Sequence, residues 1–143
     1  MPALEPAVWG PHFWFFLTTI ALIYPHTPNE EIKRKYYDLI TNLPVFLPNE
    51  NISKSFAEML QTYPVVPYLD TRADLIEWIH YIHNKVNVKL EKPEITIDQF
   101  YERYYNQYKT KAEQYAETYE WREKMIYLSL VTVSVVAIVW FNR

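Results

Sequence analysis

The chain is 143 residues long, which is enough for one domain and one membrane segment, and its formal net charge at pH 7 is −3. An acidic balance argues against a nucleic-acid partner, because such a partner needs a clustered basic face. The chain contains no cysteine, which excludes disulfides, thiolate metal sites and thiol nucleophiles within it. With one glycine and ten prolines, the composition favours helices joined by proline-containing corners over a sheet with glycine hairpins.

The first half of the sequence predicts three helices separated by such corners. The apolar and aromatic segment 9–23 has Pro11 in a position suited to a first turn, and it predicts a helix buried on most of its faces. A second helix is expected to begin at an N-cap residue, Asn29, and to end before the next group of prolines. A third helix is expected after a cap at Asn51 or Ser53.

The second half predicts a fourth and a fifth helix, so the fold class is all-α. The fourth helix is expected to start at Asp70 or Thr71, and the fifth to start at a capping box made by Thr96 and Gln99. The fifth helix is expected to run without a break into the apolar segment near the C-terminus. Four apolar residues at helical spacing form the predicted core stripe of the fourth helix: Leu75, Ile79, Ile82 and Val86.

The longest apolar segment, Met125–Phe141, predicts a transmembrane helix. Its 17 residues carry no charge, and basic residues flank it: Arg122 and Lys124 before it, Arg143 after it. At about 1.5 Å per residue the segment spans roughly 25 Å, which is close to the hydrocarbon thickness of a bilayer. Aromatic residues stand where the membrane–water interfaces would lie: Trp121, Tyr127, Trp140 and Phe141. The alternatives are a buried core helix or the edge of an oligomer.

The position of this segment predicts a single-pass C-terminal anchor. Only Asn142 and Arg143 follow it, and the N-terminus has no signal-peptide pattern, so the preceding body is expected on the cytosolic side of the membrane. The expected organisation has three parts: a helical bundle at 1–95, a fifth helix with an aromatic juxtamembrane stalk at 96–124, and the anchor at 125–141.

A dense polar cluster lies on the fourth helix, and it comprises Trp78, His80, His83, Asn84 and Asn87. His80, His83 and Asn87 share one helix face. They fit two interpretations: histidines hydrogen-bonded at the edge of the core, or half of a metal site built on Glu77-x-x-His80-x-x-His83. A metal site needs further ligands, and no second ligand set is obvious elsewhere in the sequence, so we expect no metal.

Three separated pieces of sequence carry a resemblance to a known family. The first is Trp9-Gly10-x-x-x-Trp14-x-x-Leu17-Thr18-Thr19-x-Ala21-x-x-Tyr24-Pro25, the second is Leu47-Pro48 before a helix, and the third is Trp78-x-x-x-x-His83-Asn84-x-Val86-Asn87-x-x-Leu90. In this order they resemble the first helix, the lead-in to the active-site pair and the adenine-side flavin motif of the FAD-linked sulfhydryl oxidases of the Erv/ALR type. The compact versions from large DNA viruses are the most similar.

The resemblance implies a four-helix bundle plus a short fifth helix, with FAD held in the mouth of the bundle. It also implies a set of flavin contacts: Trp9, Trp14, Thr18, Tyr24, His83, Asn84, Asn87 and Lys89. FAD is therefore the expected cofactor if the chain binds one.

The sequence departs from the family at the redox centre. Where the family has Cys-x-x-Cys after the Leu-Pro pair, this chain has Asn49-Glu50-Asn51-Ile52, and Thr18 replaces a histidine of the first helix. Exchange with a dithiol needs a thiolate that attacks a disulfide sulfur, which Asn49 and Ile52 cannot supply. Thiol oxidation by this chain alone is therefore excluded, and no catalytic residue is predicted. Glu50 is the nearest carboxylate for any other flavin chemistry.

The fifth helix region carries an aromatic stripe that predicts a partner surface. Tyr108, Tyr115 and Tyr119 recur at about helical spacing beyond the expected end of the bundle, and exposed aromatic residues are typical of protein interfaces. The alternative is a stalk whose tyrosines lie near lipid headgroups. The expected partner is a capsid protein, a membrane-associated protein or a second copy of the chain.

These observations lead to three functional hypotheses. The first is an oxidase-like but inactive membrane protein with a structural role, which the viral resemblance places at a virion inner membrane or capsid–membrane interface, where it links the two layers. The second is a membrane flavoprotein that binds FAD and acts with a cysteine-bearing partner. The third is a regulatory subunit that pairs with an active oxidase through the shared bundle surface.

Overall fold

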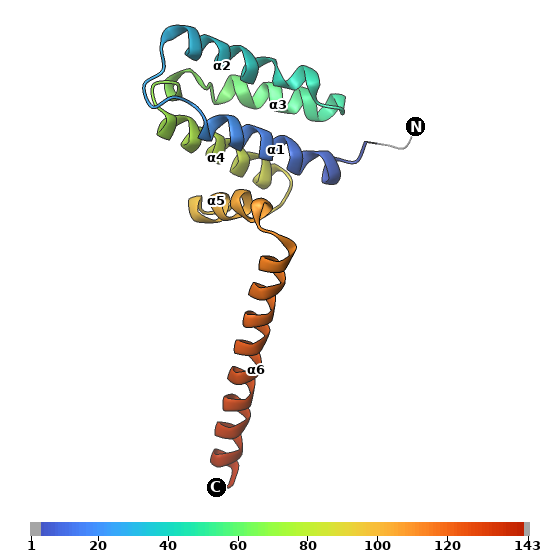
Figure 1. Ribbon diagram of the computed structural model, residues 1–143. Helices are drawn as coiled ribbons and strands as arrows, with labels where there is room; N and C mark the ends of the chain where they lie inside the picture. The colour runs from blue at the N-terminus through green and yellow to red at the C-terminus, as the bar shows by residue number, and fades with distance from the viewer. Residues whose placement is uncertain (1–3, 142–143) are drawn as a thin grey trace. The chain divides into compact units, whose positions relative to one another are not determined.

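The computed structural model describes residues 4–141, and within this range all regular secondary structure is helical, as the sequence predicts (Figure 1). The α-helices are α1 (Pro6–Leu22), α2 (Glu30–Asn42), α3 (Glu50–Thr62), α4 (Arg72–Lys89), α5 (Ile97–Tyr105) and α6 (Lys111–Phe141). Three short 3₁₀ turns connect them: η1 (Leu43–Phe46), η2 (Val66–Tyr68) and η3 (Asn106–Tyr108). The chain divides after Tyr104 into two compact units, which are described separately below.

The helix starts follow from short polar residues at their N-caps. Asn29 caps α2 as predicted, since its Oδ1 accepts a hydrogen bond from the backbone N–H of Ile32 at 2.9 Å. The prediction for α3 was wrong, because Asn49 is the cap rather than Asn51 or Ser53. The hydroxyl of Ser53 instead donates to the carbonyl of Pro44 at 2.6 Å, which ties α3 to the preceding turn η1.

The fourth helix starts at one of the two predicted caps. Thr71 is the N-cap of α4, and its Oγ1 accepts from the backbone N–H of Asp74 at 3.2 Å. Asp70, the alternative, instead forms an ion pair with Lys33 at 2.8 Å between Nζ and Oδ1. Thr71 thus caps α4, and the adjacent residue Asp70 ties the start of the helix to α2.

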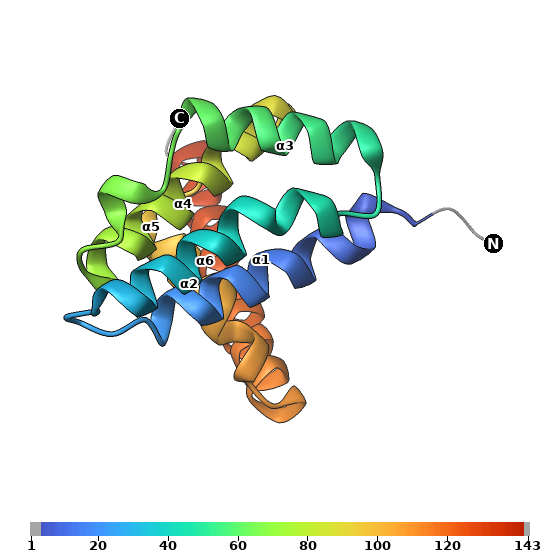
Figure 2. The same ribbon diagram turned by 90° about the horizontal axis from the view of Figure 1, so that it is seen from above.

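The core of the first unit lies between α1 and α4, which pack side by side, and it is closed by α2, α3 and α5 (Figures 1 and 2). The predicted stripe of α4 is confirmed for its first three residues, Leu75, Ile79 and Ile82, each 1% exposed. Val86, the fourth, is only half-buried. The other buried apolar residues of the two central helices are Leu17, Ile20 and Ala21 of α1, and Ile76 and Trp78 of α4; Tyr24, just after the end of α1, is buried as well.

The fifth helix packs on the bundle through Phe100 and Tyr104, which are 3% and 8% exposed. The ring of Tyr104 stacks on Phe15 with centroids 5.0 Å apart, and its hydroxyl lies 3.0 Å from that of Thr19. The predicted capping box is confirmed: the N–H of Thr96 donates to Oε1 of Gln99, and the N–H of Gln99 donates to Oγ1 of Thr96.

The expectation that the fifth helix continues unbroken to the anchor was wrong. The helix ends at Tyr105, the turn η3 follows, and Lys109 is extended with φ −66° and ψ 134°. A second capping box then starts α6, because Thr110 and Glu113 exchange hydrogen bonds with each other's backbone N–H at 2.7 and 3.3 Å.

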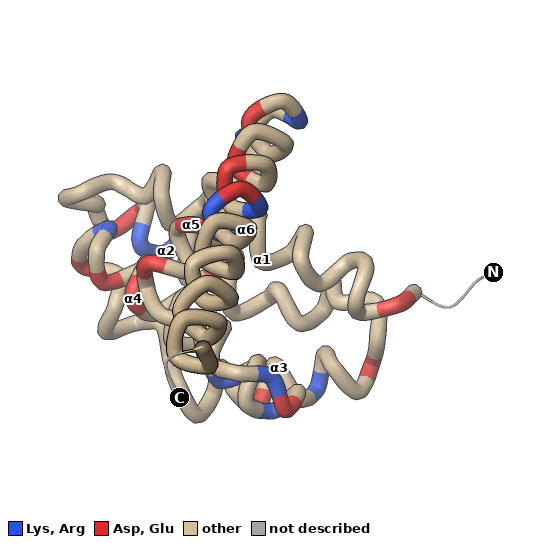
Figure 3. Tube along the Cα trace, turned by 90° about the horizontal axis from the view of Figure 1, so that it is seen from below, with Lys and Arg blue, Asp and Glu red and all other residues tan. Residues whose placement is uncertain are grey.

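The second unit is dominated by α6, whose side chains are exposed along almost its whole length. Among the described residues it is the one helix long and apolar enough to cross a membrane, with a mean hydropathy of 2.0 over its apolar part. Charged residues gather in its first part, and 125–141 has none (Figure 3). The hydroxyls of Ser129, Thr132 and Ser134 donate to carbonyls of the preceding turn at 2.7–2.8 Å, so they do not oppose insertion.

Candidate functional site

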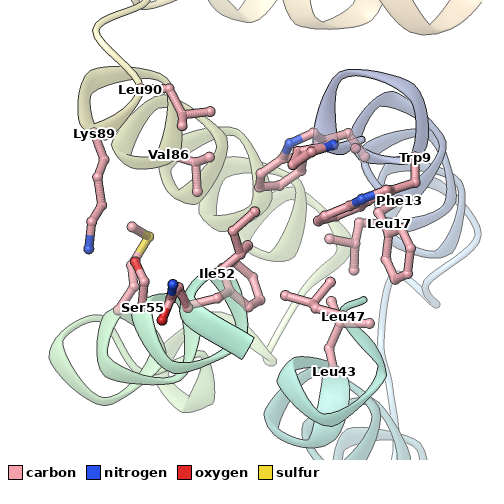
Figure 4. A pocket seen from close by; sticks show the side chains of 16 residues that line it. Trp9, Phe13, Leu17, Leu43, Leu47, Ile52, Ser55, Val86, Lys89 and Leu90 are labelled. Carbon is pink, nitrogen blue, oxygen red and sulfur yellow. The ribbon is translucent and has the colours of Figure 1, made fainter. Parts of the chain in front are cut away.

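A cavity of about 370 Å³ opens between α1, α3, α4 and the turn η1 of the first unit. Its volume lies in the range of pockets that bind small organic molecules, roughly 300–1,000 Å³. Three lining residues are polar or charged, namely Asn51, Ser55 and Lys89. The rest of the lining is Gly10 and apolar side chains, among them those of Trp9, Phe13, Trp14, Leu17, Leu43, Leu47, Ile52, Phe56, Met59, Val86 and Leu90 (Figure 4).

The aromatic wall of the cavity comes from α1. Trp9 and Phe13 are four residues apart and therefore neighbours on one helix face, with ring centroids 5.4 Å apart in an edge-to-face arrangement. The indole N–H of Trp9 donates to the carbonyl of Leu4 at 3.1 Å, which fixes the ring against the start of the helix. Trp9 and Trp14, two of the expected flavin contacts, both line the cavity.

The opposite wall comes from η1 and α3, at the positions where the resemblance places a redox pair. Asn49 turns its side chain toward the chain itself, since Oδ1 accepts from the backbone N–H of Ile52 at 3.1 Å. Ile52 lines the cavity and adds an aliphatic surface to it (Figure 4). One position therefore caps a helix and the other is part of an apolar wall.

The polar cluster on α4 binds the loop that follows the helix. The amide of Asn84 pairs with the backbone of Ile95 in both directions: Nδ2 donates to the carbonyl and Oδ1 accepts from the N–H, each at 2.9 Å. Nε2 of His80 lies 2.8 Å from the same carbonyl, and Nδ2 of Asn87 lies 3.5 Å from Oδ1 of Asn84. For His80 the interpretation as a hydrogen-bonded histidine at the core edge is therefore the better one.

His83 faces Trp14 and not the loop. The two rings stack in parallel, with centroids 4.2 Å apart and an interplanar angle of 7°. Nδ1 of His83 is buried and has no hydrogen-bond partner within the described part of the chain. Burial, reinforced by the charge of Arg103, lowers the pKa of His83 to about 4, so the ring is neutral at pH 7.

The remaining expected flavin contacts are divided between the core and the rim. Thr18 is buried inside the bundle, where its hydroxyl donates to the carbonyl of Trp14 at 2.8 Å. Tyr24 is fully buried, and its hydroxyl donates to the carbonyl of Leu69 at 2.8 Å. Lys89 lines the cavity at the end of α4. The cavity thus brings together Trp9, Trp14 and Lys89 of the expected set.

Beyond position 52, sequence reasoning missed the residues that α3 contributes to this site. Asn51, Ser55 and Met59 recur every four residues and line the cavity together with Ile52. This spacing is visible in the sequence, but the interval between 51 and 59 also carries the core residue Phe56, so the pattern indicated only a helix with an inward face.

The tyrosines of the expected partner surface are all exposed, with Tyr108 at 62%, Tyr115 at 74% and Tyr119 at 71%. Tyr115 and Tyr119 lie four residues apart on one face of α6. Tyr108 lies in η3, ahead of the break between the helices, and is therefore not part of the same continuous helix face.

Fold and cavity together define a small helical bundle with an aromatic-walled pocket, and sequence comparison identifies its class. The model of the Erv1 / Alr family matches residues 11–106. The chain therefore belongs to the Erv1 / Alr family, which confirms the resemblance stated above.

The relatives include viral and eukaryotic proteins. The chain is 34% identical over 94 residues to a protein named as a probable FAD-linked sulfhydryl oxidase of Acanthamoeba polyphaga mimivirus, covering 65% of this chain and 66% of that protein. It is 24% identical over 102 residues to a putative FAD-linked sulfhydryl oxidase of Invertebrate iridescent virus 3, covering 71% of this chain and 69% of that one. An FAD-linked sulfhydryl oxidase of rice is 31% identical over 80 residues, and the match spans 40% of its length.

Solved structures agree on the fold. The crystal structure of the yeast Erv1 core is similar with a TM-score of 0.65 and 24% identity, covering 73% of this chain and 86% of that one. FAD is a possible ligand of this chain, because its relatives are named as FAD-linked proteins. In the described residues no three histidine or acidic side chains are grouped so that they could hold a metal ion.

The residues of this chain fit the two ends of FAD unequally. Trp9 and Trp14 give the cavity an aromatic wall that suits a flat ring system. The expected adenine-side residues are engaged within the chain: Asn84 with the backbone of Ile95, and His83 with Trp14 at a stacking distance that leaves no space for a third ring between them. Within residues 4–141, Nδ1 of His83 keeps a free hydrogen-bonding position. The amide of Asn84 and the stacked faces of His83 and Trp14 are already occupied, so in the arrangement seen here these side chains fit the adenine half of FAD poorly.

Proposed function

We propose that this chain is a catalytically inactive member of the Erv1 / Alr family that is anchored in a membrane through α6 and acts as an interaction protein. The observation that carries the proposal is the use of the two redox positions: Asn49 caps α3 and Ile52 lines an apolar wall. Neither side chain contains sulfur, and thiol–disulfide exchange has no other way to proceed than through sulfur.

The proposed setting is the interface between an inner membrane and a capsid layer of a large DNA virus. Similarity to proteins of a mimivirus and an iridescent virus supports a viral origin. The basic residues Arg122 and Lys124, immediately before the span, favour placement of the preceding body on the cytosolic side. A capsid protein, a membrane-associated protein or a second copy would then bind the exposed face of Tyr115 and Tyr119.

Oxygen uptake with dithiothreitol or a reduced protein substrate tests the first part of the proposal. The purified full-length chain with added FAD is expected to consume oxygen no faster than free FAD alone. A cysteine-bearing member of the family, assayed in parallel, provides the positive control. Peroxide production above the free-flavin control would overturn the assignment as inactive.

Site-specific photo-crosslinking tests the second part. A benzophenone amino acid introduced at Tyr115 or Tyr119 is expected to give a discrete protein adduct in infected or co-expressing cells. The same group at Tyr37, which is 41% exposed on α2, provides the matched control in the helical body. Equal adducts from all three positions, or adducts with lipid alone, would remove the tyrosine face as a partner surface.

A second candidate function is a membrane flavoprotein that acts with a cysteine-bearing partner. The aromatic wall of the cavity favours it, since such a wall suits an isoalloxazine ring. The visible absorption spectrum of the purified chain decides between the two candidates. A flavin band that survives gel filtration supports the flavoprotein, and a spectrum without it removes this candidate.

A further inference from the structure

The cavity has one polar side in an otherwise apolar lining. Ser55 of α3 lies on one side of it, and Lys89 extends there from the end of α4 (Figure 4). Asn51 of α3 is the third polar residue of the lining. Lys89 is the one charged residue of the lining, and no ion pair of this side chain is seen within residues 4–141. A ligand complementary to this surface is apolar over most of its length and carries an anionic group at one end.

The Ile52 side chain strengthens the apolar character at the centre of the cavity. It lies on α3 facing the part of the lining to which Leu17 and Leu47 contribute (Figure 4). Apolar walls around an open volume gain free energy when a hydrocarbon replaces water, because the gain is proportional to the apolar area removed from water. Hydrogen-bonding groups that would orient a polar heterocycle are few here, whereas a hydrocarbon chain needs none.

We propose that the cavity binds a single-chain anionic amphiphile, with its acyl chain along the walls that Trp14, Leu17 and Ile52 help to form and its head group beside Ser55 and Lys89. The membrane span of the same chain supplies the context, since a protein anchored in a bilayer is exposed to its free fatty acids and lysophospholipids. This ligand class needs no redox chemistry and so goes beyond the proposed interaction role.

Photo-labelling of the full-length chain in phosphatidylcholine nanodiscs tests the proposal. The probe is an oleate analogue with a diazirine in its acyl chain, and labelled peptides are mapped by mass spectrometry. Label is expected in the segments 9–17 and 47–59, and unlabelled oleate is expected to remove it. A parallel competition with oleoyl lysophosphatidate distinguishes a carboxylate from a phosphate head group. Competition by either compound supports a single-chain anionic amphiphile as the ligand, and the stronger competitor identifies the preferred head group.

Two variants fill the cavity and one provides a matched control. Ile52→Trp is expected to abolish labelling of the cavity segments, whereas Val45→Trp, at a site 77% exposed outside the lining, is expected to leave it unchanged. Gly10→Leu is the second filling variant. Gly10 lies in the lining, and a Cβ at this position would have no atom within 4 Å. The Gly10→Leu variant therefore keeps the test valid if Ile52→Trp fails to fold.

A charge reversal tests the head-group contact. Lys89→Glu is expected to weaken competition by oleate about two- to fivefold, the size expected for one exposed ion pair, and to leave competition by the uncharged oleyl alcohol unchanged. Label confined to α6, or label in the cavity segments that neither filling variant reduces, would overturn the proposal. Displacement of the label by FAD but not by oleate would identify the cavity as a flavin site and would overturn it as well.

Discussion

The amide of Asn84 is predicted to hold the loop after α4 in place, and Asn84→Ala is the change that tests this. The side chain is 8% exposed and pairs with both backbone groups of Ile95, itself 4% exposed. After truncation the carbonyl of Ile95 keeps His80 at 2.8 Å, but the N–H loses the partner it has in the structure. One buried donor is therefore left unpaired.

The expected loss in the free energy of unfolding comes mainly from this unpaired backbone N–H. An unsatisfied buried hydrogen-bonding group costs about 1–3 kcal/mol, and loss of one of two bonds to the carbonyl adds roughly 0.5–1.5 kcal/mol. The higher helix propensity of alanine offsets this by about half a kcal/mol. We expect a net loss of about 1–4 kcal/mol with a midpoint near 2.5 kcal/mol, and the midpoint lowers the melting temperature of a unit of this size by roughly 10 °C or more.

Asn87→Ala provides the control, because the same residue type is removed one turn later from a site that is 7% exposed. Its amide has one long contact, 3.5 Å to Oδ1 of Asn84, so a loss of at most about 1 kcal/mol is expected. Thermal denaturation of the full-length variants in detergent, followed by near-ultraviolet circular dichroism, measures both. Equal losses for the two variants would refute the role assigned to Asn84.

Three further predictions concern the redox positions, the buried histidine and the anchor. Cysteines placed at Asn49 and Ile52 together are expected to give no dithiothreitol-dependent oxygen uptake, because Thr18 and a missing shuttle pair also depart from the family pattern; measurable uptake would contradict this. The pKa of His83 is about 4 in the folded chain and near 6.5 in the unfolded chain. The contribution of His83 to the free energy of unfolding is therefore complete above pH 6.5 and falls by up to about 3 kcal/mol as the pH drops to 4. Urea titrations should show that the free energy of unfolding of His83→Phe depends less on pH than that of the unsubstituted chain. Deletion of 125–143 should release a folded helical body from membranes, and protease added outside intact vesicles should digest the body of the full chain; a protected body would reverse the proposed orientation.

Most of the fold could be predicted from the sequence because the signals are local. Asn29 and the pair Thr96–Gln99 supply N-terminal hydrogen bonds within one turn of their helices, and such bonds depend only on nearby residues. The break before α6 was missed although its signal is also local. Thr110 and Glu113 form a capping box inside a polar stretch, where the continuing tyrosine periodicity indicated an uninterrupted helix.

The site was less predictable because its parts meet only in the folded chain. The aromatic wall on α1 could be recognised from Trp9 and Trp14, whereas Ser55 enters the site through the packing of α3 against α1 and α4. The polar residues of α4 were recognised from the sequence, but their role was not. A sequence pattern cannot distinguish an asparagine that binds a ligand from one that binds its own chain, and Asn84 binds the backbone of Ile95.

The start of α3 shows why the proposed loss of redox chemistry agrees with the stability of the bundle. An asparagine at an N-cap stabilises a helix by about 1 kcal/mol relative to alanine, and Asn49 makes the hydrogen bond on which this value depends. Ile52, the residue that donates that bond, also places its side chain in the apolar wall. A cysteine at position 49 would cap the helix less well, and a cysteine at 52 would remove methylene groups from the wall. Both positions are therefore occupied by side chains that favour the folded bundle and a more apolar cavity, which agrees with a family fold that is kept in a chain without cysteine.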